Sequence, residues 1–296
     1  MKRLFSFMAV MVVLSISAQK TANRFFYEIS FKPKQDSTKR DKVIAILDIV
    51  DGKSIYQDYT MMSQDSVLKA SVEEMQRTQT FKDMSKLVTM PKFSYKIVKK
   101  YPEMSVTYTD RISTNLFGYD DTPKLVWDIQ PDKQKIGEYN AQKATTTYGG
   151  RQWTAWFSSD LPFSDGPYKF FGLPGLIVKV EDSDKDYSWV LSGNKTIKDW
   201  KELSYGEEIN AKMAMMSNDV KIISKDKFEK AYANFKIDPM AEWKSKVPAN
   251  MMSMKMPGTE QTIGEFFKKQ EKVLNDFFNA NDNPIERTNA AKANKK

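Results

Sequence analysis

Residues 151–191 read RQWTAWFSSDLPFSDGPYKFFGLPGLIVKVEDSDKDYSWVL, and this stretch contains the patterns that decide the fold. Residues 151–157, 176–180 and 187–191 have the composition of strands, and turn-forming residues separate them. Pro174 and Gly175 suit the two central positions of a type II turn, because proline fixes φ at about −65° and glycine accepts a positive φ. The stretch therefore predicts strands joined by tight, rigid turns.

The same segment gathers aromatic and apolar side chains around its turns, which allows two interpretations. They form a platform that binds a ligand or partner, since loops on a rigid scaffold often bind, or they form a plug in the core. We favour the plug, because the segment is apolar and Gly–Pro turns are routinely architectural. The platform hypothesis assigns binding to Trp156, Phe157, Tyr168, Phe170, Phe171, Leu173, Pro174, Gly175 and Leu176.

The hexapeptide GLPGLI at 172–177 resembles the defining motif of the GLPGLI family of cell-envelope proteins. The resemblance implies one exported domain over residues 19–286, as found in diderm bacteria, and implies no particular biochemical activity. The family often has a cysteine where Ala141 stands here, so a thiol role cannot operate in this chain. Further blocks that resemble the family pattern are WF at 156–157, DLP at 160–162, GPYKF at 166–170, YNAQKAT at 139–145 and NPIE at 283–286.

Upstream of this stretch the chain is rich in strand-like segments, and its last third changes to a helical period. Many short strands at hairpin spacing predict an antiparallel sheet rather than βαβ units. We therefore expect an α+β fold with one strongly curved sheet, a half-barrel, with a closed barrel or a two-sheet sandwich as alternatives. The expected strands cover 25–31, 43–50, 93–97, 106–112, 124–129 and 139–148.

Helices are predicted in two places. Residues 67–78 have apolar side chains on one helical face, within a segment, 63–91, that has the character of an insertion. In the last third, Ser224 suits the cap of a helix through 228–235. Thr262 and Glu265 form a capping box at the start of another helix. We expect these C-terminal helices to cover one face or opening of the sheet.

The two ends of the chain carry different signals. Residues 1–18 read as a secretory signal peptide, with Lys2 and Arg3 before thirteen largely apolar residues and cleavage expected before Gln19. No later run reaches eighteen apolar residues, so no transmembrane segment is expected in the mature protein. The lack of cysteine excludes lipoprotein anchoring. We predict a periplasmic or secreted protein with a disordered basic tail at 287–296.

Composition excludes many kinds of chemistry. The 296 residues include no cysteine and no histidine, so disulfides, thiolate or imidazole metal sites, Cys nucleophiles and His bases are absent. The net charge of +8 comes from Lys and Arg scattered among Asp and Glu rather than a dense stripe, so we expect no nucleic-acid partner. The length suffices for a stable core without disulfides.

The remaining candidates for chemistry are weak. Asp182, Asp184 and Asp186 begin like a calcium loop but lack its glycine and glutamate, so we interpret them as a hairpin turn. The loop-like carboxylates Asp120, Asp121, Asp160 and Asp165 have no spacing that fixes an acid–base pair. Soft Cu(I) binding through a thioether cluster is an alternative function, although methionine also fills irregular packing. That cluster comprises Met251, Met252, Met254 and Met256.

Two classes of function therefore compete: a non-catalytic binding protein of the cell envelope and a His-free carboxylate enzyme. The first is preferred, because the common acid–base and nucleophilic residues are missing while rigid turns hold apolar groups in place. An apolar ligand, a lipid and an outer-membrane protein partner stay open as the bound species. No cofactor is expected.

Overall fold

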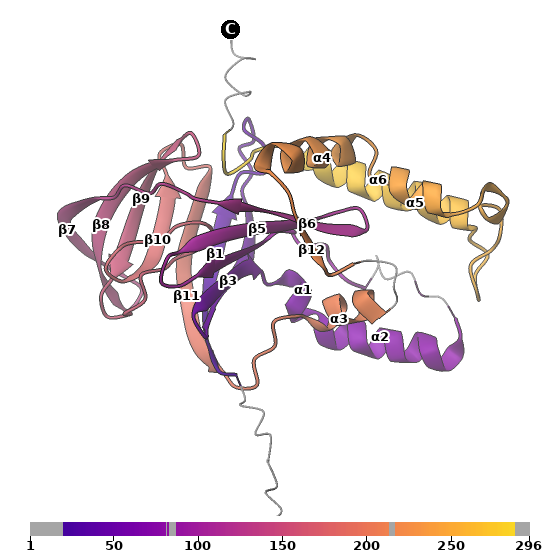
Figure 1. Ribbon diagram of the computed structural model, residues 1–296, viewed down its shortest axis with the longest axis horizontal. Helices are drawn as coiled ribbons and strands as arrows, with labels where there is room; N and C mark the ends of the chain where they lie inside the picture. Colours follow the sequence, from indigo (N-terminus) through magenta and orange to yellow (C-terminus); the bar gives the residue numbers. More distant parts are fainter. Residues whose placement is uncertain (1–19, 81, 83–86, 213–216, 288–296) are drawn as a thin grey trace, which may run out of the picture.

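The computed structural model describes residues 20–80, 82, 87–212 and 217–287, and it shows an α+β protein built on one large sheet (Figure 1). The helices are α1 (Thr60–Ser63), α2 (Asp65–Thr78), α3 (Tyr205–Lys212), α4 (Lys225–Ile237), α5 (Ala241–Lys246), a 3₁₀ turn η2 (Ala249–Met251) and α6 (Ile263–Ala280). The strands are β1 (Ala22–Phe31), β2 (Asp41–Val50), β3 (Lys53–Asp58), β4 (Lys96–Lys100), β5 (Ser105–Ile112), β6 (Asn115–Asp121), β7 (Asp128–Ile136), β8 (Tyr139–Tyr148), β9 (Arg151–Ser158), β10 (Leu176–Asp182), β11 (Tyr187–Ile197) and β12 (Val220–Ile222).

The strands form a single twelve-stranded sheet in the order β12-β6-β5-β4-β3-β2-β1-β11-β10-β9-β8-β7. All neighbours are antiparallel except β12 and β6, which run parallel. The β1–β11 pairing joins two meanders, β1–β6 and β7–β11, and places the N-terminal strand near the centre of the sheet. The expected antiparallel α+β architecture is therefore confirmed.

The expectation of a strongly curved half-barrel, or of a closed barrel, is wrong. Strands β12 and β7 are the two edges, and within the described residues neither pairs with a further strand, so the sheet stays open (Figure 1). The sequence of β7 explains one edge: its side chains are mostly exposed, and Pro131 lacks the N–H that a ladder needs. The other edge, β12, is only three residues long, and all three residues are exposed.

Local patterns predicted several elements closely. Strand β8 has the predicted bounds 139–148, and both α2 and α4 contain the predicted helical segments. The Ser224 side chain accepts from the Lys227 N–H, and Thr262 with Glu265 forms the expected capping box. Strands β3 and β6 were not predicted. The strand expected at 124–129 begins only at Asp128 and continues as the exposed edge β7.

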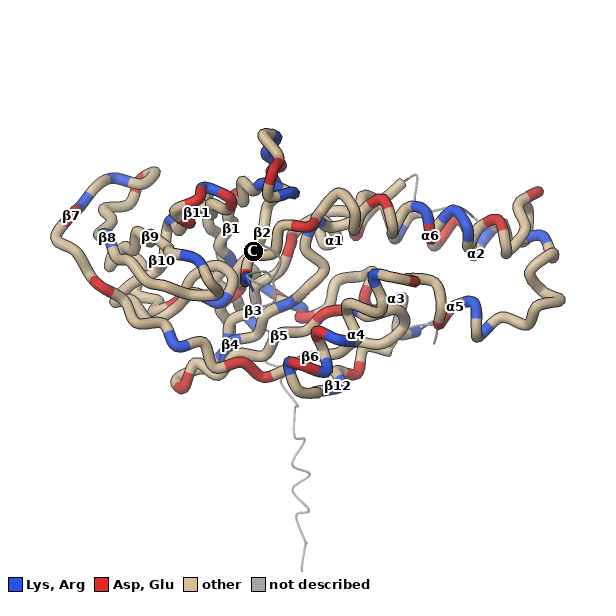
Figure 2. The backbone as a smooth tube through the Cα atoms, turned by 90° about the horizontal axis from the view of Figure 1, so that it is seen from above, with Lys and Arg blue, Asp and Glu red and all other residues tan. Residues whose placement is uncertain are grey.

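The helices lie in two groups on the side of the sheet where β5 and β6 are found (Figure 1). Helices α1, α2 and α3 pack on one another, and α4 packs on β5 and β6. Helices α5 and α6 lie beside α4 (Figure 1). None of the described helices is long and apolar enough to cross a membrane. Basic and acidic residues interleave along both groups, as Figure 2 shows.

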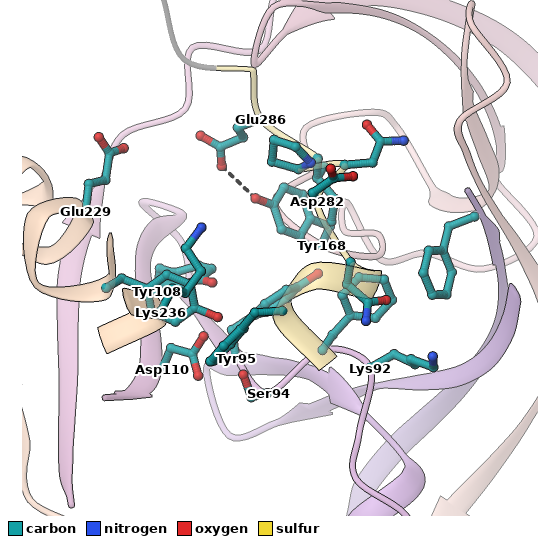
Figure 3. A pocket seen from close by; sticks show the side chains of 18 of the residues that line it. Lys92, Ser94, Tyr95, Tyr108, Asp110, Tyr168, Glu229, Lys236, Asp282 and Glu286 are labelled. Atoms are coloured by element: carbon teal, nitrogen blue, oxygen red, sulfur yellow. Dashed lines mark hydrogen bonds between the residues drawn. The ribbon is translucent and has the colours of Figure 1, made fainter. Parts of the chain in front are cut away.

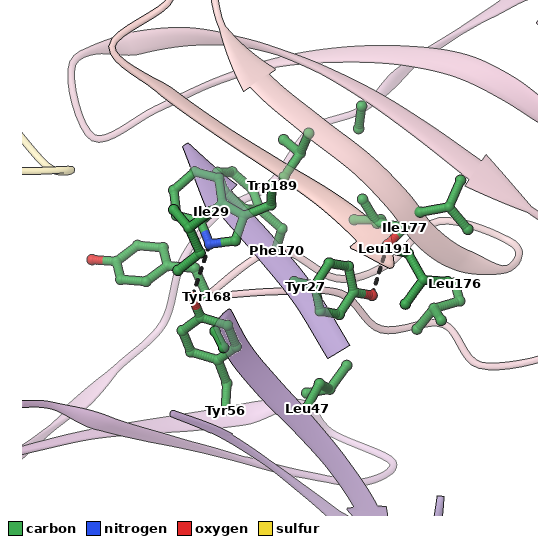
Figure 4. Close-up of a cluster of buried hydrophobic side chains, with 14 of the residues drawn as sticks. Tyr27, Ile29, Leu47, Tyr56, Tyr168, Phe170, Leu176, Ile177, Trp189 and Leu191 are labelled. Carbon is green, nitrogen blue, oxygen red and sulfur yellow. Dashed lines mark hydrogen bonds between the residues drawn. The ribbon is translucent and has the colours of Figure 1, made fainter. Parts of the chain in front are cut away.

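The core is built on the middle of the sheet and is rich in aromatic side chains (Figure 4). Trp189 donates to the Tyr56 hydroxyl over 2.8 Å, and the Tyr27 hydroxyl donates to the Ile177 carbonyl over 2.8 Å. Phe170 is fully buried against Trp153, with ring centroids 4.8 Å apart. The core therefore includes the β9–β10 connection, residues 159–175, packed against the strands.

At the C-terminal end, residues 281–286 cross the edge of the core; we call this segment the C-terminal strap. Arg287, expected in the tail, is held by its N–H bond to the Gly149 carbonyl (2.7 Å) and by an ion pair with Asp184 (2.7 Å). The rest of that tail, 288–296, and the signal segment, 1–18, lie outside the described residues.

Candidate functional site

The hexapeptide turn differs from the predicted type II geometry. The Gly175 N–H donates to the Leu173 carbonyl over 2.8 Å, two residues back, whereas the Leu176 N–H donates to Leu161 over 3.0 Å. Gly175 has φ of +149°, where a side chain is strained. The turn is therefore a tighter three-residue turn centred on Pro174. Leu176 is already the first residue of β10.

The structure places most of the platform residues in the core. Of the nine, only Pro174 is exposed, and Trp156 and Phe171 are partly buried. Their burial matches the architectural interpretation of this segment. The buried members are Phe157, Tyr168, Phe170, Leu173, Gly175 and Leu176.

A buried ion pair locks the same connection to the sheet. Lys99 of β4 pairs with Asp165, and both side chains are 0% exposed. The Lys99 ammonium also donates to the Gly166 carbonyl over 2.6 Å and to the Tyr168 carbonyl over 3.2 Å. Burial lowers the pKa of Lys99, although the Asp165 carboxylate opposes that shift. The pair thus satisfies backbone carbonyls that would otherwise be buried without donors.

A deep hollow lies elsewhere, between the β4–β6 region, α4, the end of α6 and the C-terminal strap (Figure 3). We call it the aromatic cleft: its volume is about 410 Å³, and eleven aromatic residues line it. The β4–β6 region contributes Tyr95, Tyr108 and Tyr119, while α4 contributes Phe228 and Tyr232. Of the platform residues, Tyr168 alone reaches this cleft.

A buried carboxyl group lies at the foot of the aromatic cleft. Asp110 is 2% exposed and accepts from the Arg111 N–H over 2.7 Å. Burial raises the pKa of Asp110 to about 7, although this bond and one from Ser94 oppose the shift. The group therefore changes charge near neutral pH inside a cleft.

A second polar group lies where the strap meets the sheet. The fully buried Lys169 ammonium contacts Asp121 at 2.6 Å and Glu286 at 2.5 Å. It also lies 5.2 Å from the ring centre of Tyr108 and 5.1 Å from that of Tyr119. Burial acts to raise the pKa of Glu286, but Lys169 and its other donors hold it at about 2. The lysine thus fills an aromatic cage from within and fixes the strap.

The β8–β9 turn leaves room for the strap. A side chain at Gly149 would meet the Cα of Glu286 at 3.1 Å, and Gly149 has φ of +58°. Arg151, just beyond the turn, donates to the carbonyls of Ile285 and Pro284, each over 2.9 Å. A glycine turn and one arginine therefore hold the wall of the cleft in place.

Lower stability at higher pH is expected because of Asp110. Its carboxyl keeps its proton in the folded state up to a pKa of about 7, whereas its ordinary value is 3.8. Between those two values the folded state binds more protons than the unfolded chain, so stability falls as pH rises, by about 1.4 kcal/mol per pH unit at most. Asp110→Asn should remove this slope, as denaturant unfolding across that pH range would show.

The lowered pKa of Glu286 changes the stability with the opposite sign and over a lower pH range. The ionised Glu286 stabilises the fold fully above its ordinary pKa of 4.5, and this stabilisation is lost as the pH falls toward about 2. Both proteins share it, so it cancels in the difference between wild type and the Asp110→Asn variant. Parallel stability curves for the two proteins would refute the role given to Asp110.

A smaller apolar hollow of about 270 Å³ adjoins the aromatic cleft, lined by side chains such as Trp243 and Leu274. The two share a wall that consists of Ser94, Tyr232, Phe277 and Phe278. Its volume lies below the usual range for small-molecule sites, about 300–1,000 Å³. The aromatic cleft is therefore the better candidate site.

The acidic run at 182–186 forms the predicted hairpin turn, and arginine side chains pair with its carboxylates. The three carboxylates lie within 4.8 Å of one another. Arg151 contacts Asp182 at 2.6 Å and Asp186 at 2.8 Å, while Arg287 pairs with Asp184. Two arginine side chains thus neutralise the carboxylates that a calcium ion would need as ligands.

The methionine cluster and the remaining carboxylates lie in different parts of the fold. The methionine cluster lies between α5 and α6, with Met251 and Met254 exposed and Met252 and Met256 partly buried. Among the carboxylates weighed for catalysis, Asp165 is buried against Lys99, and Asp160 is exposed. Asp120 accepts a hydrogen bond from the Thr107 hydroxyl group, and Asp121 forms an ion pair with Lys169.

Sequence reasoning missed Asp110, Tyr95 and the strap as parts of one site. Asp110 lies in a predicted strand, where period two alone gives no sign that a carboxyl is buried. Lys169 and Glu286 are 117 residues apart in the chain. The block NPIE at 283–286 was the one available signal, and it gave no partner for its glutamate.

A family model matches only a short segment of this chain. Residues 148–179 match the model of a family described as "Protein of unknown function (Porph_ging)", and the match spans the hexapeptide. No curated protein matches the chain. Two solved structures of PNGF-II, in space groups P21 and C2, are similar at 15% identity, with TM-scores of 0.47 and 0.46. Each alignment covers 72% of this chain, which spans about a third of theirs, 33% and 32%.

Proposed function

We propose that this protein is an exported, non-catalytic envelope protein that binds a small ligand with an apolar surface in the aromatic cleft. The observation that carries the proposal is the cleft itself, because about 410 Å³ lies within the usual range for ligand sites. Its walls combine aromatic faces with a few polar groups that could orient a ligand. The signal-like segment at 1–18 supports export, and mass spectrometry from the native host should find Gln19 at the N-terminus.

A ligand is favoured over an outer-membrane protein partner. A protein interface needs a contiguous apolar patch. The exposed large apolar side chains of the described residues instead fall on many separate elements, from Val67 in α2 to Val126 before β7 and Ile237 at the end of α4. The aromatic cleft gathers its apolar groups in one concave place.

A His-free carboxylate enzyme is the second candidate. One observation favours it: Asp110 and Glu286 line the same cleft, and the pKa of one is raised to about 7 while that of the other is lowered to about 2. Such a divergence can assign an acid and a base. Glu286 is already held by Lys169 and Lys225, however, so binding without turnover is preferred.

Glu229→Trp is expected to abolish binding of an uncharged apolar dye such as Nile red. Glu229 is exposed on α4 and lines the cleft, so an indole there would fill the space at little cost to the fold. Fluorescence titration of the dye would measure the loss. Lys230→Trp is the matched control: it places the same side chain on the same helix, outside the cleft lining.

Equal dye binding by the Glu229→Trp variant and wild type would contradict the proposal. The enzyme alternative is tested on any native ligand that co-purifies with the protein. Its mass should be unchanged after incubation with fresh protein. Conversion of that ligand, lost in Asp110→Asn, would make the enzyme the leading function.

A further inference from the structure

Two residues that line the aromatic cleft each have a buried polar atom that lacks a hydrogen-bond partner. Among the described residues, four buried side-chain atoms are unpartnered, and two of them, the Tyr95 hydroxyl and the Asn281 Oδ1, belong to residues that line this cleft. Tyr95 is 8% exposed, and it lies on the cleft wall in Figure 3. Leaving such groups unpaired is costly, so their presence points to a ligand that pairs with them.

Both atoms are held in fixed positions. The Tyr95 ring contacts Tyr108 at 5.1 Å and Tyr168 at 5.7 Å between centroids, so the hydroxyl cannot swing away. The Asn281 Nδ2 donates to the Phe277 carbonyl over 2.7 Å, which leaves Oδ1 as an acceptor. The residues that line the cleft thus include a phenol donor and an amide acceptor. A ligand hydroxyl group can pair with either of them, because it both donates and accepts a hydrogen bond.

The charges that line the cleft favour a neutral ligand. Besides Asp110, the lining has three lysines and three carboxylates. Lys225 pairs with Glu286 at 2.9 Å, and Lys92 pairs with Asp41 at 3.0 Å. Neither a strong anion site nor a strong cation site results. The lining carboxylates can instead accept hydrogen bonds from further hydroxyl groups.

The aromatic walls favour a ring with apolar faces. Tyr108, Tyr232, Phe277 and Phe278 are only partly buried and line the hollow. Their faces can cover the C–H surface of a saturated ring, while its hydroxyl groups point to the polar atoms at the rim. A fatty acyl chain would cover the same faces but would leave Tyr95 and Asn281 unpaired.

We propose that the aromatic cleft binds a neutral carbohydrate, one ring of which lies on the aromatic wall and directs hydroxyl groups toward Tyr95 and Asn281. This inference rests on the proposed function and names its ligand class.

The test uses an immobilised array of neutral and acidic oligosaccharides, followed by calorimetric titration of the best neutral binder. Tyr95→Phe should weaken that binding about tenfold, since one hydrogen bond is lost. Its melting temperature should be unchanged or higher, because the variant removes an unpaired polar group. Tyr59→Phe, outside the cleft, is the matched control and should leave the affinity unchanged.

The outcomes separate this inference from the proposed function. If no neutral sugar binds while the dye binds wild type and not Glu229→Trp, the carbohydrate class is wrong and ligand binding stands. If neither sugar nor dye binds, the proposed function fails as well. An unchanged affinity of Tyr95→Phe for a bound sugar would overturn the placement of its hydroxyl.

Discussion

Gly175→Ala is expected to unfold the protein, with a loss of more than about 4 kcal/mol in the free energy of unfolding. A Cβ at this position would lie 2.2 Å from the Ser158 carbonyl oxygen and 2.6 Å from its carbon. Leu176, the next residue, pairs with Ser158 in the β9–β10 ladder, so the two backbones cannot move apart without breaking the sheet. The φ of +149° adds strain of its own. Soluble yield and urea unfolding would measure the loss.

Gly193→Ala is the matched control for that substitution. Gly193 lies in β11, and a Cβ there would meet nothing within 4 Å. Its replacement should change the free energy of unfolding by less than about 1 kcal/mol. Alanine restricts the backbone of the unfolded chain slightly and adds only one methyl group. Similar stabilities for the two variants would mean that the hexapeptide is not the architectural element we describe.

Lys99→Met is expected to cost about 3–5 kcal/mol, the second largest effect we predict. Lys99 and Asp165 are both 0% exposed, so the variant leaves a buried carboxylate without its cation. It also removes the donor to the carbonyls of Gly166 and Tyr168. Chemical denaturation at neutral pH would measure the change in the free energy of unfolding.

Two companion variants make the result specific. Lys99→Met combined with Asp165→Asn should recover a large part of the loss, because the unpaired charge is gone. Lys42→Met removes the exposed pair with Glu28, whose side chains are 65% and 43% exposed, and should cost less than about 1 kcal/mol. Equal losses for Lys99→Met and Lys42→Met would show that the buried pair is not important for the fold.

Much of the secondary structure was predictable because its causes are local. The turn residues that flank 139–148 and the capping residues Ser224 and Thr262 act within a few positions of themselves. The boundaries of β8 and the starts of α4 and α6 follow from them. Strand β3 shows the limit: it follows the Asp51-Gly52 turn, but its sequence, KSIYQD, is short and mixed in polarity.

The candidate site was much less predictable. The period of two in β4 places Lys99 on the same face as Ile97, which hints at burial. Nothing local, however, names Asp165 as its partner. Asp110 gave no signal at all. The turn of the hexapeptide was assigned to the wrong type because the Leu176 N–H bonds the distant Leu161 carbonyl rather than the Leu173 carbonyl.

The sequence by itself determined the fold class, the helix caps, the position of Gly175 at a tight turn and the segment that packs around it. These depend on the φ preferences and side-chain periods of neighbouring residues. Only the tertiary structure decided that the sheet stays open, that Lys169 lies among tyrosines, and that Tyr95, Asp110 and Asn281 line one cleft. Burial changes the pKa of a carboxyl group and removes a hydroxyl group from bulk water, and burial depends on segments that meet only after the chain has folded.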